Sequence, residues 1–241
     1  MPNLKIAIIG NSVALRTRPP EKFPDNKNYA QYLEEMLDES LPNQNVLVIN
    51  KGVGASTSFN ALQNLQDYIQ IFPNYYIINL GVVDASTRDI PIWFNRAVNS
   101  VKRTPWVFLS KLIYSNFLIH IRPIMVKFRG KRSWVSKKRF KNYLYLITKT
   151  ILKDTNAKIV FLPINVANER VEKQLPGSKA NHQSFNEIIK NIAEENGQQL
   201  VDLNAFISRD HYPDGVHYNK KGHQLIAHKL FDIIIKDYSR K

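Results

Sequence analysis

Short apolar runs alternate with longer amphipathic stretches along the whole chain. The runs are rich in β-branched residues and cover residues 4–9, 45–49, 75–80, 157–162 and, more weakly, 199–201. A helical period of apolar positions covers residues 28–39, 58–71, 138–153, 179–196 and 219–236. Runs that are apolar on both faces suit buried parallel strands, and strand-helix alternation places helices on both faces of a sheet. The pattern predicts a doubly wound three-layer α/β/α fold with about five parallel strands.

One stretch interrupts this regular pattern. Residues 101–140, approximately, contain Pro105, Pro123 and Gly130 and show no clean period, so we expect a partly helical insertion between the third and fourth strands. The chain has 241 residues, of which 44% are hydrophobic, and lacks internal repeats and Gly/Ser-rich linkers. We therefore expect a single domain over residues 1–241, with this insertion.

The positive charge of the chain is concentrated in the same region. Residues 90–153 contain fifteen Lys or Arg and no acidic residue, so 34 − 15 leaves nineteen basic against twenty acidic residues elsewhere. Aromatic residues interleave with these charges at Trp106, Phe108, Tyr114, Phe117, Phe128, Trp134, Phe140, Tyr143 and Tyr145. Such a mixture suits a platform that recruits an anionic or lipid-linked glycan, or peripheral contact with an anionic membrane. A solvated basic surface over packed aromatics is the alternative, and no recognised nucleic-acid-binding module is present.

Several classes of protein are excluded by what the sequence lacks. Without cysteine there is no disulfide framework, no thiolate zinc site and no cysteine nucleophile. The first ten residues lack a signal-peptide pattern, and no stretch reaches about 18 uninterrupted apolar residues. We expect a cytoplasmic protein without a membrane span, and the sequence gives no prediction of its oligomeric state.

Residues that could carry chemistry follow the predicted strands, where ligands bind in such folds. Ser12 follows the first strand, either as a nucleophile or as a helix cap. Asp214 and His217 are three residues apart in a Pro-Asp-Gly loop, so the carboxylate can orient the imidazole as a general base. A plain turn, or a metal site built from Asp210, His211, Asp214, His217 and His223, remain alternatives. The remaining histidines, which lack an acidic neighbour in sequence, are expected on the surface or a helix face: His120, His182 and His228.

Four blocks of the sequence resemble the SGNH or GDSL hydrolases, serine esterases and acyl transferases with a flavodoxin-like sheet. They are Gly-Asn-Ser at 10–12, Asn-Lys-Gly-Val-Gly-Ala-Ser-Thr at 50–57, Leu-Gly-Val-Val-Asp at 80–84, and Asp-Gly-Val-His at 214–217. The resemblance implies that Ser12 is the nucleophile, His217 the general base and Asp214 its orienting partner. It implies a backbone N–H from Gly54 or Ala55 in the oxyanion hole, and no metal or other cofactor.

Two positions depart from the family pattern. The glycine of the second block falls on Ala55, and the asparagine of the third block, a side-chain oxyanion donor, is Val83. Loss of such a donor typically costs about 2.7 to 4 kcal/mol in the transition state. By position, three side chains could replace it: Asn11, Asn165 and Arg88. Arg88 could equally pair with Asp84 and hold the loop, which is the interpretation we favour.

Two functions follow from this sequence. The first is serine-dependent hydrolysis or transfer of an O-acyl ester, expected to be O-acetyl. The loop at 81–88 resembles that of family members linked to bacterial surface polysaccharides, so we expect an acylated small molecule or glycan as substrate. The alternative is a catalytically weak or inactive binding protein on the same fold, which uses the basic insertion to hold an anionic glycan or a membrane.

Overall fold

Five parallel strands form the centre of the molecule in the computed structural model, which describes residues 4–22, 25–95 and 119–238. The strands are β1 (Leu4–Gly10), β2 (Val46–Asn50), β3 (Tyr75–Asn79), β4 (Lys158–Phe161) and β5 (Gln199–Leu200). They pair in the order β2-β1-β3-β4-β5, with Leu4 opposite Val46 and Ile6 opposite Tyr75. The predicted strands and the doubly wound sheet are confirmed.

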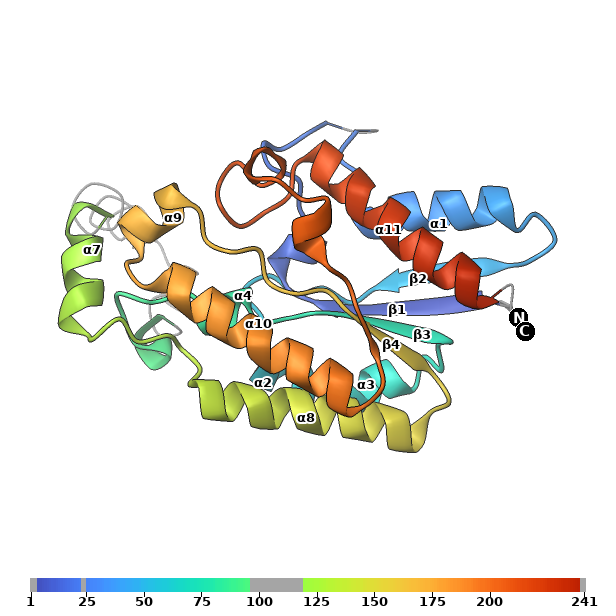
Figure 1. Cartoon of the computed structure of the whole chain (residues 1–241), viewed down its shortest axis with the longest axis horizontal. Helices are drawn as coiled ribbons and strands as arrows, with labels where there is room; N and C mark the ends of the chain where they lie inside the picture. Colours follow the sequence, from blue (N-terminus) through green and yellow to red (C-terminus); the bar gives the residue numbers. More distant parts are fainter. Residues whose placement is uncertain (1–3, 23–24, 96–118, 239–241) are drawn as a thin grey trace, which may run out of the picture.

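Helices cover both faces of this sheet, as Figure 1 shows. On one face lie α1 (Tyr29–Ser40) and α11 (Lys220–Tyr238), which pack against each other. On the other face lie α2 (Ser58–Gln63), α3 (Leu65–Ile69), α8 (Lys137–Asp154) and α10 (Ser178–Glu195). The result is the predicted three-layer α/β/α arrangement.

The helices pack through apolar stripes at the spacing of helical turns. In α1, Tyr29, Leu33 and Leu37 lie four positions apart and form, with Ala30, a buried stripe; the helix packs against β2 and α11. On the opposite face, the rings of Phe140 in α8 and Phe185 in α10 lie 4.7 Å apart and are fully buried. Burial of these stripes is the main force that holds the three layers together.

The helices differ from the sequence prediction in three places. The stretch predicted as one helix over 58–71 is two, α2 and α3, because Asn64 leaves the helical conformation between them. Two short helices, α4 (Val82–Ala85) and α9 (Glu169–Gln174), follow β3 and β4 and were not predicted. Both are about one or two turns long, too short for a periodic pattern to reveal.

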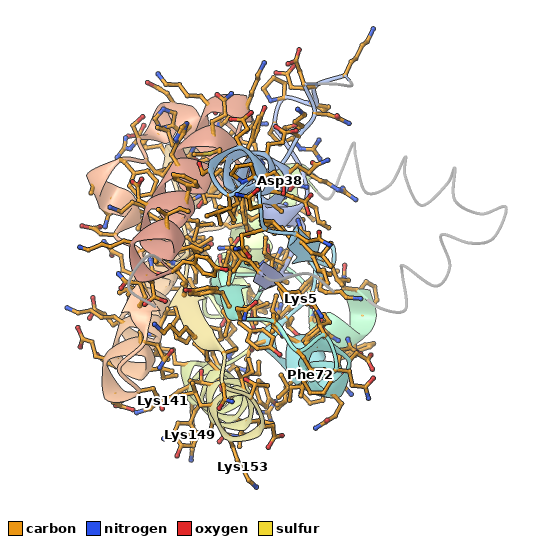
Figure 2. All side chains as sticks on the ribbon, turned by 90° about the vertical axis from the view of Figure 1, so that its right-hand side faces the viewer. Lys5, Asp38, Phe72, Lys141, Lys149 and Lys153 are labelled. Carbon is orange, nitrogen blue, oxygen red and sulfur yellow. The ribbon has the colours of Figure 1, made fainter. Side chains whose placement is uncertain are left out.

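Much of the basic aromatic insertion lies outside the described residues, including Trp106, Phe108, Tyr114 and Phe117. Its described part contains α7 (Ile119–Phe128), a connection and the start of α8. Basic side chains line the outer face of α8, and Lys141, Lys149 and Lys153 project from it in Figure 2. Among the helices of the described ranges, none is both long and apolar enough to cross a membrane.

Candidate active site

The first candidate residue, Ser12, lies in a short 3-10 helix (Ser12–Ala14) directly after β1. Asn11 caps this turn, because its Oδ1 accepts a hydrogen bond from the backbone N–H of Val13 at 3.0 Å. A Cβ on Gly10 would lie 3.0 Å from that of Ala14, so the tight exit from β1 needs glycine. β1 lies between β2 and β3, and Ser12 therefore sits at the carboxyl edge near the switch in strand order.

The second candidate pair, Asp214 and His217, lies in the loop before α11. Asp214 Oδ1 accepts hydrogen bonds from the backbone N–H groups of Val216 at 2.9 Å and His217 at 2.7 Å. Gly215 has a φ of +84°, and a Cβ at this position would overlap Asn168 and Val171. The Asp-Gly-Val-His sequence therefore folds into one tight turn that fixes the carboxylate beside the imidazole.

Ser12, His217 and Asp214 form a continuous hydrogen-bonded chain. Ser12 Oγ lies 2.9 Å from His217 Nε2, and His217 Nδ1 lies 2.7 Å from Asp214 Oδ2. An ionised carboxylate can only accept, so Nδ1 carries the proton and the Nε2 lone pair faces the serine hydroxyl. Burial raises the pKa of Asp214, but hydrogen bonds from His217 and Val216 more than offset it, and the pKa lies below its ordinary value. The carboxylate is thus ionised at neutral pH.

The loop after β2 provides candidate donors for an oxyanion. Val53 N–H donates to Gly10 O at 3.1 Å, which ties this loop to the end of β1 beside Ser12. Ala55 adopts a left-handed conformation with φ +58°, which glycine adopts more readily. Gly54 and Ala55 are exposed, and within the described part of the chain neither backbone N–H has an acceptor. Both N–H groups are therefore available to a ligand.

The third block holds its loop through Asp84 and Ser58. The buried Asp84 carboxylate accepts hydrogen bonds from Ser58 N–H at 2.9 Å and from Ser58 Oγ at 2.6 Å. Burial raises the pKa of Asp84 to about 6, and the charge of Arg88 opposes this only weakly. Arg88 instead stacks 4.1 Å from the ring of Trp134 and donates to the carbonyl of Val83 at 3.3 Å. Among the described residues, the hydrogen bonds to the Asp84 carboxylate thus come from Ser58 and not from the expected partner Arg88.

Asn165, a predicted substitute donor, is engaged with the loop that carries His217. Its Nδ2 donates to Val216 O at 3.3 Å, and its Oδ1 accepts from Tyr218 Oη at 2.9 Å. The side chain is 8% exposed. Its amide therefore bridges the two residues on either side of His217.

His182 lies on a face of the helix α10, one of its two predicted places, but that face is fully buried and not on the surface. Its Nδ1 donates to the carbonyl of Asn165 at 2.8 Å, and its Nε2 lies 2.9 Å from Ser86 Oγ. Burial lowers the pKa of His182 to about 4, so the ring is neutral at pH 7. A signal was present in the sequence: His182 falls on the same helical stripe as Phe185 and Ile189. His228, in contrast, is exposed, and the side chain of His120 lies outside the described residues.

The histidines of the alternative metal site have other partners. His211 Nδ1 accepts a hydrogen bond from Ser208 N–H at 3.0 Å, and His223 lies between Tyr29 N–H and Arg16 O, each at 3.2 Å. Across the described ranges, no group of three or more His, Asp or Glu side chains is arranged to hold a metal ion. The geometry thus assembles the serine-centred arrangement and not the metal site.

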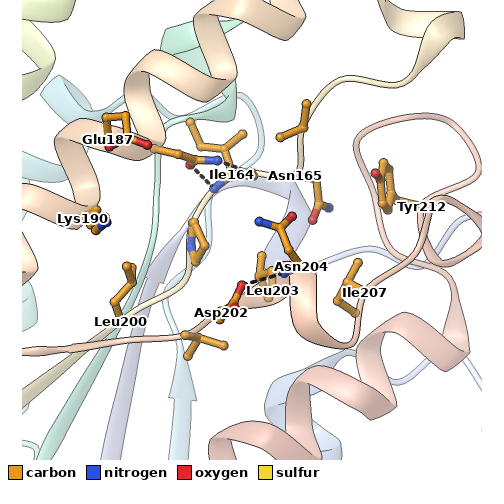
Figure 3. A pocket seen from close by; sticks show the side chains of 14 residues that line it. Ile164, Asn165, Glu187, Lys190, Leu200, Asp202, Leu203, Asn204, Ile207 and Tyr212 are labelled. Carbon is orange, nitrogen blue, oxygen red and sulfur yellow. Dashed lines mark hydrogen bonds between the residues drawn. The ribbon is translucent and has the colours of Figure 1, made fainter.

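A cavity of about 400 Å³, lined by both polar and apolar side chains, lies beyond the carboxyl ends of β4 and β5 (Figure 3). Asn165 and Tyr212 lie on one side of it, and Glu187 and Lys190 on another. Neither Ser12 nor His217 lines this cavity, so it is a neighbour of the candidate active site and not its centre.

Comparisons with known proteins define the class to which this fold and site belong. The model of the GDSL-like lipase/acylhydrolase family matches residues 8–225, and the chain belongs to that family. The class of enzyme is therefore an ester hydrolase. Comparison of the sequence with curated proteins gave no match.

Solved structures share the fold at low sequence identity. A lipase/acylhydrolase from Enterococcus faecalis is 15% identical with a TM-score of 0.65, covering 96% of this chain and 95% of that one. An α/β hydrolase from the metagenome of Lake Arreo in Spain is 18% identical with a TM-score of 0.64, covering 96% and 94%. A catalytic mutant of an acetylxylan esterase from Geobacillus stearothermophilus is 17% identical with a TM-score of 0.63, covering 96% and 94%. These likenesses support the three-layer fold.

Proposed function

We propose that this protein is a serine esterase that removes an O-acyl group, most simply acetyl, from a sugar or glycan. The observation that carries the proposal is the hydrogen-bonded chain from Ser12 Oγ through His217 to Asp214, with distances of 2.9 and 2.7 Å. Residues 205 positions apart in sequence meet in the geometry that activates a serine hydroxyl.

The proposal assigns a group to each step of the reaction. Ser12 Oγ attacks the ester carbonyl carbon while His217 Nε2 takes the hydroxyl proton, and Asp214 stabilises the imidazolium that forms. The backbone N–H groups of Gly54 and Ala55 are the proposed donors to the oxyanion. His217 then returns the proton to the leaving alkoxide, and the alcohol departs from the acyl-Ser12 intermediate.

Water or a second hydroxyl then attacks the acyl carbon with His217 again as base, and Ser12 is released. We propose that water is the acceptor. We propose Asn11 as the side-chain donor to the oxyanion. Its Oδ1 accepts the capping hydrogen bond from Val13, and its Nδ2 can donate. Arg88 and Asn165 are weaker candidates for this role, because both are engaged with neighbouring loops.

Two observations support an acetylated carbohydrate as substrate. The loop at 81–88 resembles that of family members linked to bacterial polysaccharides, and three structures with the same fold are catalytic mutants of an acetylxylan esterase. In that esterase the mutated residues are a serine, and an aspartate and a histidine three positions apart. The spacing equals that of Asp214 and His217 here.

The experiment is an acetate-release assay on the purified full chain with acetylated xylo-oligosaccharides and 4-nitrophenyl acetate. We expect turnover of both, and loss of turnover in folded Ser12→Ala. Added sugar acceptors test for transfer, which would appear as a new acetylated product. Undiminished turnover in Ser12→Ala would overturn the proposal.

A second function, peripheral membrane binding, is favoured by the exposed surface of α7. Phe128 is 95% exposed and Ile124 is 67% exposed, and the exposed basic residues Lys127 and Lys131 lie beside them. Apolar side chains next to cations suit an anionic interface. Cosedimentation with phosphatidylserine vesicles, but not with phosphatidylcholine vesicles, is expected and should fall in Phe128→Ser. If the wild type and Phe128→Ser sediment equally with phosphatidylserine vesicles, membrane binding through α7 is contradicted.

A further inference from the structure

Two arginines follow the 3-10 helix that carries Ser12. Arg16 is exposed, Thr17 is buried, and the side chain of Arg18 is 34% exposed. The backbone beneath them is anchored: Arg16 N–H donates to Ser12 O at 3.2 Å, and Arg18 N–H donates to Tyr218 O at 2.8 Å. The anchored backbone thus places two cationic residues at the rim of the candidate active site.

The two guanidinium groups lie near different parts of that site. Arg16 Nη2 is 4.0 Å from where a Cβ on Gly54 would be, so it lies over the loop that offers the oxyanion donors. Arg18 Nε lies 3.9 Å from Asp214 Oδ2, at the opposite end of the Ser12–His217 pair. A ligand that reaches Ser12 between the Gly54 loop and Asp214 therefore passes both cations.

The two arginines differ in their ionic partners, because Arg18 pairs with Asp214 and Arg16 pairs with no described carboxylate. In the described part of the chain, no carboxylate lies within ion-pair distance of Arg16. Arg18 pairs with Asp214 at 3.9 Å, and the same carboxylate oxygen accepts a hydrogen bond from His217 Nδ1 at 2.7 Å, so Arg16 carries the uncompensated charge of this rim. Guanidinium groups match the geometry of carboxylates and phosphates, and the net charge of +14 favours the approach of anions in general.

We infer that Arg16 and Arg18 bind an anionic group, a carboxylate or a phosphate, on the alcohol part of the ester. The inference rests on the proposed esterase function and narrows its substrate to acylated acidic sugars or sugar phosphates. The arginines select the substrate, because they bind its anionic group while its ester carbonyl lies at Ser12 Oγ.

The test compares three acetyl esters of closely related sugars, one neutral, one with a carboxylate and one with a phosphate. They are an O-acetylated methyl glucoside, the matching glucuronate and the matching glucose phosphate, each assayed for kcat/KM. We expect an about tenfold preference for at least one anionic ester at low salt, lost at about 0.5 M salt. The better of the two anionic substrates identifies the group that binds. Equal kcat/KM for all three esters would overturn the inference and leave the esterase function intact.

Substitutions of the two arginines test whether they cause the preference for anionic esters. In Arg16→Gln and in Arg18→Gln the ratio of anionic to neutral kcat/KM should fall towards one. The matched control is Arg139→Gln, which removes an exposed arginine from α8 and should keep the wild-type ratio. A ratio that falls equally in all three variants would show a general field effect and contradict a site at Arg16 and Arg18. No hydrolysis of any ester by the folded protein would overturn the proposed function itself.

Discussion

Asn165 Nδ2 lies 3.3 Å from the carbonyl oxygen of Val216, the residue that immediately precedes His217. On the other side of His217, Tyr218 Oη donates to Asn165 Oδ1 at 2.9 Å. The backbone carbonyl of Asn165 in turn accepts a hydrogen bond from Nδ1 of the buried His182. Asn165, Tyr218 and His182 therefore form a hydrogen-bond network that supports the loop carrying His217, the base of the proposed reaction. The position of His217 thus depends on side chains that do not touch substrate.

Tyr218→Phe tests this support with little change of shape. It removes the hydroxyl that orients the Asn165 amide, so we expect kcat to fall about tenfold with KM nearly unchanged, since His217 is displaced and substrate contacts are not. The matched control is Tyr76→Phe, which removes a buried hydroxyl bonded to Tyr68 O at 3.1 Å on β3. Equal kcat values in the two variants would show that Tyr218 does not position His217.

Asp214→Asn is expected to lower kcat by up to about 10⁴ while the loop keeps its fold. An amide in place of the carboxylate can donate to His217 Nδ1, which favours the tautomer whose Nε2 carries the proton and cannot accept from Ser12. Asp202→Asn is the control, because the exposed Asp202 caps a short 3-10 helix by accepting a hydrogen bond from the backbone N–H of Asn204 at 3.1 Å. Steady-state kinetics that give the two variants equal kcat would show that another group orients His217.

Ala55→Gly should stabilise the protein by about 1 kcal/mol, because Ala55 has a φ of +58° and glycine adopts that conformation without the Cβ penalty. We expect esterase activity to be retained, since the backbone N–H stays in place. Ala180→Gly is the opposite control: it lies on the exposed face of α10 and should destabilise by about 1 kcal/mol. Urea unfolding measures both, and a destabilised Ala55→Gly would contradict the strain argument.

Acid should destabilise the protein through two buried histidines. Burial lowers the pKa of His182 and of His223 to about 4. Between pH about 6.5 and about 4 the unfolded chain binds protons on these rings and the folded protein does not, so the free energy of unfolding falls as the pH falls. Asp84 acts in the opposite direction, since its pKa is raised to about 6. The two histidines lower the free energy of unfolding by more than Asp84 raises it, so we expect a net fall of about 3 kcal/mol in this free energy as the pH falls through this range.

Urea unfolding at about pH 7, 5.5 and 4.5 would measure this loss. His223→Gln should make the loss smaller, because one of the two rings no longer takes up a proton on unfolding. Constant or rising stability across the window would contradict the account.

Much of the fold was predictable because the strands are short apolar runs that pack on both faces. The same logic located Ser12, Asp214 and His217, since the carboxyl ends of parallel strands share one edge. Local patterns failed where tertiary contacts decide the outcome. The conformation of Asn64 ends α2, and the burial of His182 depends on α4 and on Asn165, which lies distant in sequence.

The surroundings of the candidate oxyanion donors were the least predictable part of the site. Sequence position placed Asn11, Asn165 and Arg88 at the right edge, but hydrogen bonds set where each side chain points. Asn165 donates to the carbonyl of Val216, and the Arg88 guanidinium lies over the ring of Trp134. No pattern in one dimension shows which partner such a side chain takes.

The central claim is that His217 activates Ser12, and covalent labelling with a fluorophosphonate probe tests it most directly. Intact-mass analysis and peptide mapping should show one probe per chain, on Ser12. Labelling should be absent in Ser12→Ala and slower by at least about a hundredfold in His217→Ala. Ser86 is an internal control, because its hydroxyl also bonds a histidine, at 2.9 Å, but is buried. Labelling that persists in Ser12→Ala, or at an equal rate in His217→Ala, would contradict the account.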